Sequence, residues 1–368
     1  MRLLYVILPV VFAFALSACE SDYRPMSKGG MDEVVVVLDS TQWSSDTALA
    51  LDETFGRGIE TLPRPEGAYR LIYRDFSNNA ELESLKEFKN VMFVSPIDAE
   101  TNVGTFIRAL LSDDVEERVR TEESFAFPLE NRWVRDQWTL ILTSTTDELL
   151  AEKIRNSEES LVGHLADREF DRRLDEIYRR GEQTELSDSL WNQHGWSVRM
   201  QHDYVRTVDT TNVTVFRRSL PDNDRWMWAW WQDDVESPDF IDGEWINATR
   251  DSLMEIYMRG SREESYITTE YRRPVETSAI ERDDRITGFE TLGVWRMTED
   301  FMGGPFVNFT YYDPATQRLY MIEYGQFAPS VAKRRFVRQF QAMGRTFQAD
   351  STVNQSSEPT SNQLSEAN

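Results

Sequence analysis

Apolar residues in the first half of the chain form short unbroken runs that alternate with segments of helical periodicity. The runs 34–38 and 90–97 show no polar alternation, which is typical of strands covered on both faces. Helical spacing follows at 46–59 and 103–111, and a further strand is expected at 138–143. This alternation predicts a domain in which helices pack against a central sheet.

The longest helical pattern runs from residue 148 to residue 180, with an apolar stripe among charged residues. Gly181 follows as a candidate C-cap, and a second, short helix is expected over 184–194. We therefore place a domain boundary here. It separates an N-terminal α/β domain, residues 31–183, from a C-terminal α+β domain, residues 184–348.

The second half is rich in patterns of extended chain. The run 226–231 puts alternate tryptophans on one face of a strand, and we favour a core strand covered on both faces over a platform for sugar rings. Residues 293–329 predict two strands joined by a turn at 313–316, where proline fixes φ. An amphipathic helix ends the domain, and we expect its basic residues to face water: Lys333, Arg334, Arg335 and Arg338.

Paired glycines precede this hairpin, in the stretch Met302, Gly303, Gly304, Pro305 and Phe306. Glycines before a proline permit backbone angles that other residues avoid, and they block a helix. The stretch therefore predicts a kink. It fits the lip of a ligand site and a corner of the sheet equally well.

Together these patterns predict an α+β protein of two mixed α/β sandwich domains, with largely antiparallel sheets flanked by helices. The order of elements in the C-terminal half looks like the layout of the PsbP and Mog1 type of fold. A shared layout does not imply a shared function.

The first residues have the pattern of a bacterial lipoprotein signal peptide, residues 1–18. The apolar run 3–16 is too short to span a bilayer, and it ends in a lipobox, Leu16-Ser17-Ala18-Cys19. Cys19 is the only cysteine, so we expect it to carry the acyl chains that anchor the mature chain. These chains are expected to be fatty acids such as palmitate. Residues 19–30 are expected to form a tether and residues 349–368 a disordered tail.

The net charge of −24 argues against nucleic acid or an anionic membrane face as the main partner. Only five of the 40 basic residues are lysine. An acid-rich, lysine-poor surface suits high salt, because screening removes self-repulsion. The composition therefore predicts a halophilic source.

The sequence contains no familiar catalytic or metal-binding pattern. Its three histidines do not pair at ligand spacing, and it lacks a phosphate-binding loop, a nucleophile elbow and a dinucleotide-binding glycine motif. We therefore expect no cofactor, no metal and no catalytic residue.

Several short stretches resemble a family of Bacteroidota lipoproteins, domain of unknown function 4837, across nearly the whole mature chain. These stretches are Trp43, Leu62-Pro63 with Glu66, Trp133 with Asp136-Gln137, Arg250-Asp251, Gly260 with Ser265-Tyr266, Trp295, Met302 to Phe306, and Ala328-Pro329 with Lys333-Arg334. The stretch from Met302 to Phe306 is the most specific. Arg64 departs from the family pattern, in which a glutamine is expected.

The family has no assigned activity, so the resemblance implies no catalytic residues. Arg135 and its neighbours precede a strand, where they would line a cleft or form a charged entry loop. The candidate binding residues are Trp133, Arg135, Gln137, Arg250, Trp295, Arg296, Met302, Gly303, Gly304, Pro305 and Phe306.

We expect a non-catalytic binding or assembly module, anchored to the outer membrane through Cys19 and facing the periplasm or the cell surface, with other envelope proteins as partners. One alternative is an envelope hydrolase acting on glycan or peptide through Glu299 or Asp300. Another is a small-molecule carrier with an apolar cavity under the tryptophan run.

Overall fold

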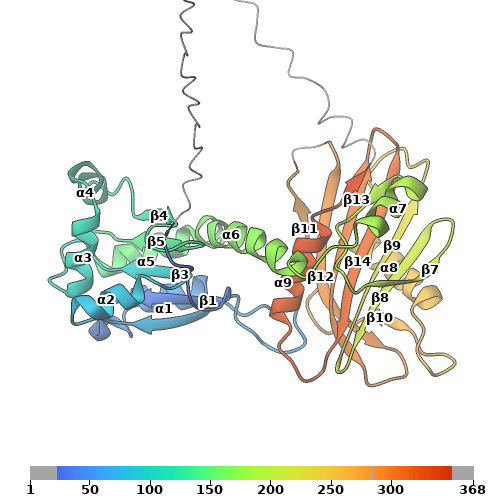
Figure 1. The fold of residues 1–368 in the computed structure, drawn as a ribbon, viewed down its shortest axis with the longest axis horizontal. Helices are drawn as coiled ribbons and strands as arrows, with labels where there is room; N and C mark the ends of the chain where they lie inside the picture. The colour runs from blue at the N-terminus through green and yellow to red at the C-terminus, as the bar shows by residue number, and fades with distance from the viewer. Residues whose placement is uncertain (1–22, 283–284, 350–368) are drawn as a thin grey trace, which may run out of the picture.

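The computed structural model describes residues 23–282 and 285–349, and the expected signal peptide, Cys19 and the tail from residue 350 lie outside this part. Figure 1 shows two domains side by side, bridged by the long helix α6 (Glu158–Tyr178). Within the described residues no helix is long and apolar enough to cross a membrane.

The described N-terminal residues form a five-stranded sheet in the order β2-β1-β3-β5-β4. The strands are β1 (Glu33–Val37), β2 (Arg70–Arg74), β3 (Asn90–Val94), β4 (Ala126–Glu130) and β5 (Trp138–Leu142). All neighbours pair in parallel except β4 with β5. The expectation of largely antiparallel sheets is wrong for this domain, because helical connections return successive strands in the same direction.

Helices cover both faces of this sheet. One face packs on α1 (Asp46–Thr54), α5 (Asp147–Asn156) and the first half of α6, and the other on α2 (Asn79–Leu85) and α3 (Asn102–Leu110). The short helices η1 (Ser40–Gln42) and α4 (Asp113–Arg120) lie in the connections. The single helix expected over 148–180 is two helices, α5 and α6, which meet at Ser157.

The described C-terminal residues form an antiparallel sheet in the order β10-β12-β13-β14-β9-β8-β7, with β11 also paired to β12. Its strands are β7 (Val205–Asp209), β8 (Val213–Leu220), β9 (Asn223–Gln232), β10 (Ile267–Thr269), β11 (Glu276–Ile280), β12 (Thr287–Met297), β13 (Gly303–Asp313) and β14 (Arg318–Phe327). The α+β class and the hairpin β13–β14 are confirmed.

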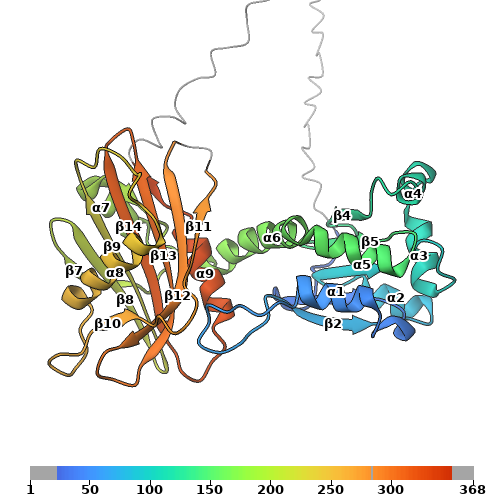
Figure 2. The same ribbon diagram turned by 180° about the vertical axis from the view of Figure 1, so that it is seen from behind.

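Helices also cover both faces of the second sheet. α8 (Gly243–Tyr257) packs on one face, in front of the strands in Figure 2, while α7 (Thr184–His194), α9 (Arg334–Gly344) and the end of α6 pack on the other. The short pair β6 (Trp196–Ser197) and β15 (Gln348–Ala349) lies beside them. Trp228 and Trp231, on opposite faces of β9, belong to separate cores, which confirms the two-sided core strand.

Lys333 and Arg334 are buried, so the expectation that they face water is wrong. The Glu66 carboxylate, from the N-terminal domain, accepts hydrogen bonds from their backbone N–H groups at 2.7 and 2.9 Å. The Arg334 guanidinium also pairs with buried Glu169 of α6 at 3.3 Å. The start of α9 is therefore part of the contact between the two domains.

Candidate functional site

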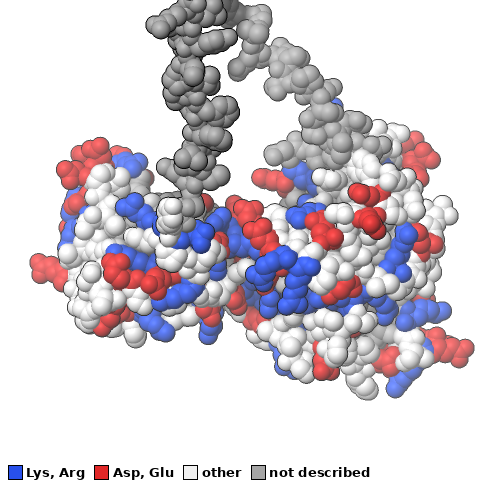
Figure 3. Space-filling view, in the orientation of Figure 1, with Lys and Arg blue, Asp and Glu red and all other residues white. Residues whose placement is uncertain are grey.

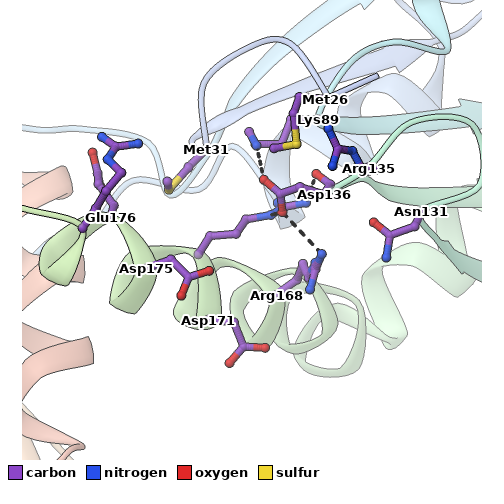
Figure 4. Close-up of a pocket in the computed structure, with 12 residues that line it drawn as sticks. Met26, Met31, Lys89, Asn131, Arg135, Asp136, Arg168, Asp171, Asp175 and Glu176 are labelled. Carbon is purple, nitrogen blue, oxygen red and sulfur yellow. Dashed lines mark hydrogen bonds and ion pairs between the residues drawn. The ribbon is translucent and has the colours of Figure 1, made fainter. Parts of the chain in front are cut away.

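A cavity of about 540 Å³ lies where the first described residues meet α6 and the loop before β5 (Figure 4). Its lining residues are Met26, Met31, Lys89, Asn131, Arg135, Asp136, Arg168, Asp171, Arg172, Asp175, Glu176 and Arg179. We call it the strap pocket, and we call residues 25–31, which form one wall, the strap. Figure 3 shows basic and acidic side chains gathered together where the two domains meet.

The strap is hydrogen-bonded to the domain through its backbone. The Arg135 N–H donates to the Pro25 carbonyl (2.8 Å), and the Ser27 N–H donates to the Arg135 carbonyl (3.0 Å). The Lys28 N–H donates to the Glu87 carbonyl (2.9 Å), and the Lys28 carbonyl accepts from the Lys89 N–H (2.7 Å). Part of the segment expected as a tether is thus fixed in place, and the chain is held from Pro25 onward.

Asp136 is the centre of the pocket floor. It has a φ of 57°, in the left-handed region that aspartate tolerates better than most residues. Its carboxylate pairs with Lys89, with Arg172 Nε at 2.7 Å and with Arg168 Nη2 at 3.3 Å. Partial burial raises the pKa of Asp136, but the Lys89 hydrogen bond and the Arg172 charge lower it more, so the net pKa lies below its usual value. The floor therefore carries an ionised carboxylate.

Asn90 holds Arg172, a residue of the pocket floor, in place. This buried side chain accepts a hydrogen bond from Arg172 Nη1 at 2.6 Å and donates to the carbonyls of Met31 (3.1 Å) and Glu33 (2.9 Å). Arg172 is itself only 4% exposed. Because each of these polar groups has partners, the floor is rigid and already formed without a ligand.

The rim of the pocket carries free charges of both signs. Arg135, Asp171, Asp175 and Arg179 are exposed, and in the part of the chain that the structure describes none of them forms an ion pair or a side-chain hydrogen bond. Asp171 and Asp175 are four residues apart on α6, so they lie on the same face of the helix. The rim can therefore contact both an anionic and a cationic group.

Of the candidate binding residues, only Arg135 lines the strap pocket. Buried Gln137 donates from its amide to the carbonyls of Lys86 (2.6 Å) and Phe88 (2.9 Å), and it accepts from the Trp133 N–H (3.0 Å). Trp133 packs edge-on against Phe93, with the ring centroids 5.6 Å apart. These contacts support the loop before β5.

The other candidates lie in the C-terminal domain, and the structure does not bring the two groups together. Arg250 is fully buried and pairs with Glu323 through two contacts of 2.7 and 2.9 Å. Trp295 is buried and donates to the Gln326 carbonyl (3.2 Å), while half-exposed Arg296 lies 3.8 Å from Glu270.

The predicted kink is wrong. Gly303 and Gly304 begin β13 in regular pairing with β12, and neither has a positive φ. A Cβ at position 304 would lie 2.0 Å from the Gln326 carbonyl oxygen of β14. Pro305 and Phe306 are buried in the same strand, and Met302 is 38% exposed at its start. The glycine permits close approach of two strands rather than a bend.

Sequence reasoning missed most of the pocket. Lys89 directly precedes β3, and Asp136 lies two residues before the start of β5; these strands are parallel neighbours, so the two side chains meet at one edge of the sheet. The charges of α6 have the spacing of an ordinary solvent-exposed face. Among the described residues, no group of three or more His, Cys, Asp and Glu is placed to hold a metal ion.

Two families match the chain. Residues 183–346 match the family described as Domain of unknown function (DUF4837), and residues 27–178 match the one described as Domain of unknown function (DUF8532). The first match was expected over nearly the whole mature chain, yet it covers the C-terminal part, and stretches such as Trp43 and Glu66 fall in the second match. No curated protein matches the chain.

Solved structures resemble the chain only weakly. The Saccharomyces cerevisiae Ran-binding protein Mog1p has a TM-score of 0.30 at 9% identity, covering 43% of this chain and 92% of its own. A STAR-related lipid transfer protein from Xanthomonas axonopodis has 0.22 at 8%, covering 39% and 98%. The human StAR-related lipid transfer protein 5 has 0.21 at 10%, covering 54% and 100%. At such scores the likenesses carry no conclusion about function.

Proposed function

We propose that this chain, whose residues 183–346 match the DUF4837 family, is a non-catalytic binding module of the cell envelope, anchored through a lipid on Cys19. Its ligand site is the strap pocket. The lipobox at residues 16–19 supports the anchor, and the geometry of the pocket supports the binding role.

The observation that carries the binding role is the contrast between the floor and the rim of the pocket. On the floor, Asp136 and Arg172 have partners and hold a fixed geometry. On the rim, the side chains of Arg135, Asp171 and Asp175 have no ion pair or hydrogen bond with any residue that the structure describes. A preformed cavity whose lining is mostly charged, with unpaired groups at its rim, can hold a charged ligand through charge-assisted hydrogen bonds.

The hydrolase alternative has less support. Of its two candidate carboxylates, Asp300 accepts a hydrogen bond from Ser265 Oγ (2.6 Å) and pairs with Arg262 (3.2 Å). These contacts hold the connection between β12 and β13. The carrier alternative needs space beneath Trp228, but this side chain is packed within a core.

The first test of the proposal concerns the anchor. We expect the mature protein to carry its acyl chains on Cys19, and Cys19→Ser to abolish them, because a serine hydroxyl does not become the thioether-linked lipid. Mass spectrometry of the N-terminal peptide measures this directly, with Ser21→Ala as the matched control. An unmodified Cys19 in the native envelope would contradict the anchor.

The second test concerns the pocket. A photo-crosslinking residue at Asp171 is expected to capture a defined ligand in the native envelope, because this side chain is exposed and lines the pocket. The same residue at exposed Asp167, which lies beside α9, is the control. Adducts at position 171 that are absent at 167 and weakened by Arg135→Glu support the site. Identical adducts at both positions, or none at 171, would refute it.

A further inference from the structure

We propose that the ligand of the strap pocket is a phosphoethanolamine group, a phosphodiester anion joined by two carbons to a primary ammonium. This inference rests on the proposed binding function and adds the chemical class of the ligand. Three features support it: the order of unpaired charges along α6, a described lining without aromatic side chains, and the short chain distance to the anchor.

The anionic part of the ligand fits one end of the pocket. Figure 4 shows Arg135, Asn131 and Arg168 toward this end. Arg168 is partly exposed in the lining and pairs with Asp136 through Nη2 at 3.3 Å, and Arg135 has no ion pair among the described residues. Guanidinium groups bind phosphate oxygens through paired, charge-assisted hydrogen bonds. A phosphodiester at this end of the pocket would therefore meet the guanidinium groups of Arg135 and Arg168.

The cationic part fits the carboxylates that follow on the same helix. Asp171 and Asp175 continue along α6 away from Arg168 (Figure 4). Arg168 and Asp171 are three residues apart, a rise of about 4.5 Å along the helix, which a two-carbon linker spans. A primary ammonium offers three donors to such carboxylates. A purely anionic ligand would be repelled by them.

The lining discriminates between kinds of ammonium. Quaternary ammonium groups have no N–H donor and are bound by aromatic cages. None of the lining residues that the structure describes is aromatic, and Met26 and Met31 supply the apolar contact. The pocket therefore favours ethanolamine over choline.

The position of the pocket brings a bilayer within reach. Cys19 and Pro25, the first fixed residue of the strap, are six positions apart, so the connection spans at most about 22 Å in any conformation. With a lipid on Cys19, headgroups lie close to the pocket. A chain of net charge −24 is repelled by acidic lipids but not by a zwitterionic headgroup. The phosphoethanolamine has two possible sources, a bilayer lipid or a soluble ester.

The test uses the full lipidated chain in detergent and titrates it calorimetrically with glycerophosphoethanolamine. We expect binding that weakens at least about tenfold in Arg135→Gln and in Asp171→Asn, because each change removes an unpaired rim charge. Arg180→Gln and Asp167→Asn, exposed positions outside the pocket on or next to α6, are the matched controls. Glycerophosphocholine and glycerol phosphate are expected to bind at least about tenfold more weakly.

The two sources are then separated in vesicles. If phosphatidylethanolamine in phosphatidylcholine vesicles weakens the apparent affinity for the soluble ester, the ligand is the bilayer lipid. If it does not, the ligand is a soluble ester. Both outcomes support the chemistry. Absence of binding, equal binding of glycerol phosphate, or unchanged affinity in both rim variants overturns it. A different ligand captured at position 171 would overturn the class while keeping the binding module.

Discussion

Replacing Glu323 by leucine is expected to lower the free energy of unfolding by about 3–5 kcal/mol. Glu323 and Arg250 are both fully buried and joined by two short contacts. The substitution leaves the guanidinium in the core with Asp251 (3.0 Å) and Thr269 (3.1 Å) as its remaining partners. Asn308 also loses an acceptor at 3.2 Å. Urea denaturation followed by tryptophan fluorescence measures the loss.

The double variant Arg250→Met/Glu323→Leu distinguishes an isolated charge from a packing defect. The double variant removes the buried guanidinium together with its carboxylate partner, while Asp251 is partly exposed and keeps its hydrogen bonds from Thr269 and Tyr271. It is therefore expected to be more stable than Glu323→Leu alone. Arg272→Ala breaks an exposed ion pair with Glu270 and is the control, with an expected change within about 0.5 kcal/mol. A double variant as unstable as the single one would show that the pair is not the cause.

Replacing Gly304 by alanine is expected to cost about 3 kcal/mol or more. The new Cβ would lie 2.0 Å from the Gln326 carbonyl oxygen, a backbone atom of the neighbouring strand, and 3.0 Å from Trp295 Nε1. Neither strand can move away without losing its pairing, and Trp295 donates to the same carbonyl. Thermal unfolding followed by tryptophan fluorescence measures the change.

Gly58→Ala is the matched control for this prediction. No atom lies within 4 Å of a Cβ at position 58, so its effect is expected to stay within about 1 kcal/mol. Gly303→Ala, where the nearest atom is the Trp295 carbonyl oxygen at 2.9 Å, should fall between the two. Equal stabilities of the three variants would contradict the explanation by close approach.

The elements of the fold were predictable where apolar residues recur with a clear period. The central strand β9 and the amphipathic helix α9 follow directly from such patterns. The helix α4 does not, because Val119 is its single buried residue and leaves no stripe to read. The direction of the N-terminal strands was missed although the sequence carries a signal for it, since unbroken apolar runs such as 34–38, separated by helices, are typical of parallel sheets.

The candidate site was harder to predict because its residues depend on strand order. Lys89 and Asp136 come together only when β3 and β5 are neighbours with the same direction. Arg250 was predicted as a candidate binding residue, but it is a buried residue of the core. A buried, ion-paired arginine and a ligand-binding arginine look alike in a sequence, and burial alone separates them.

The helix α6 belongs to both domains, and this has an evolutionary consequence. Leu165 packs in the N-terminal core and Ile177 in the C-terminal core, although both precede the border between the two family matches. A gene divided at that border would separate the C-terminal sheet from the end of α6, which packs on it. Because α6 contributes side chains to both cores, neither half has a complete core without this helix. The two halves are therefore expected to be inherited together.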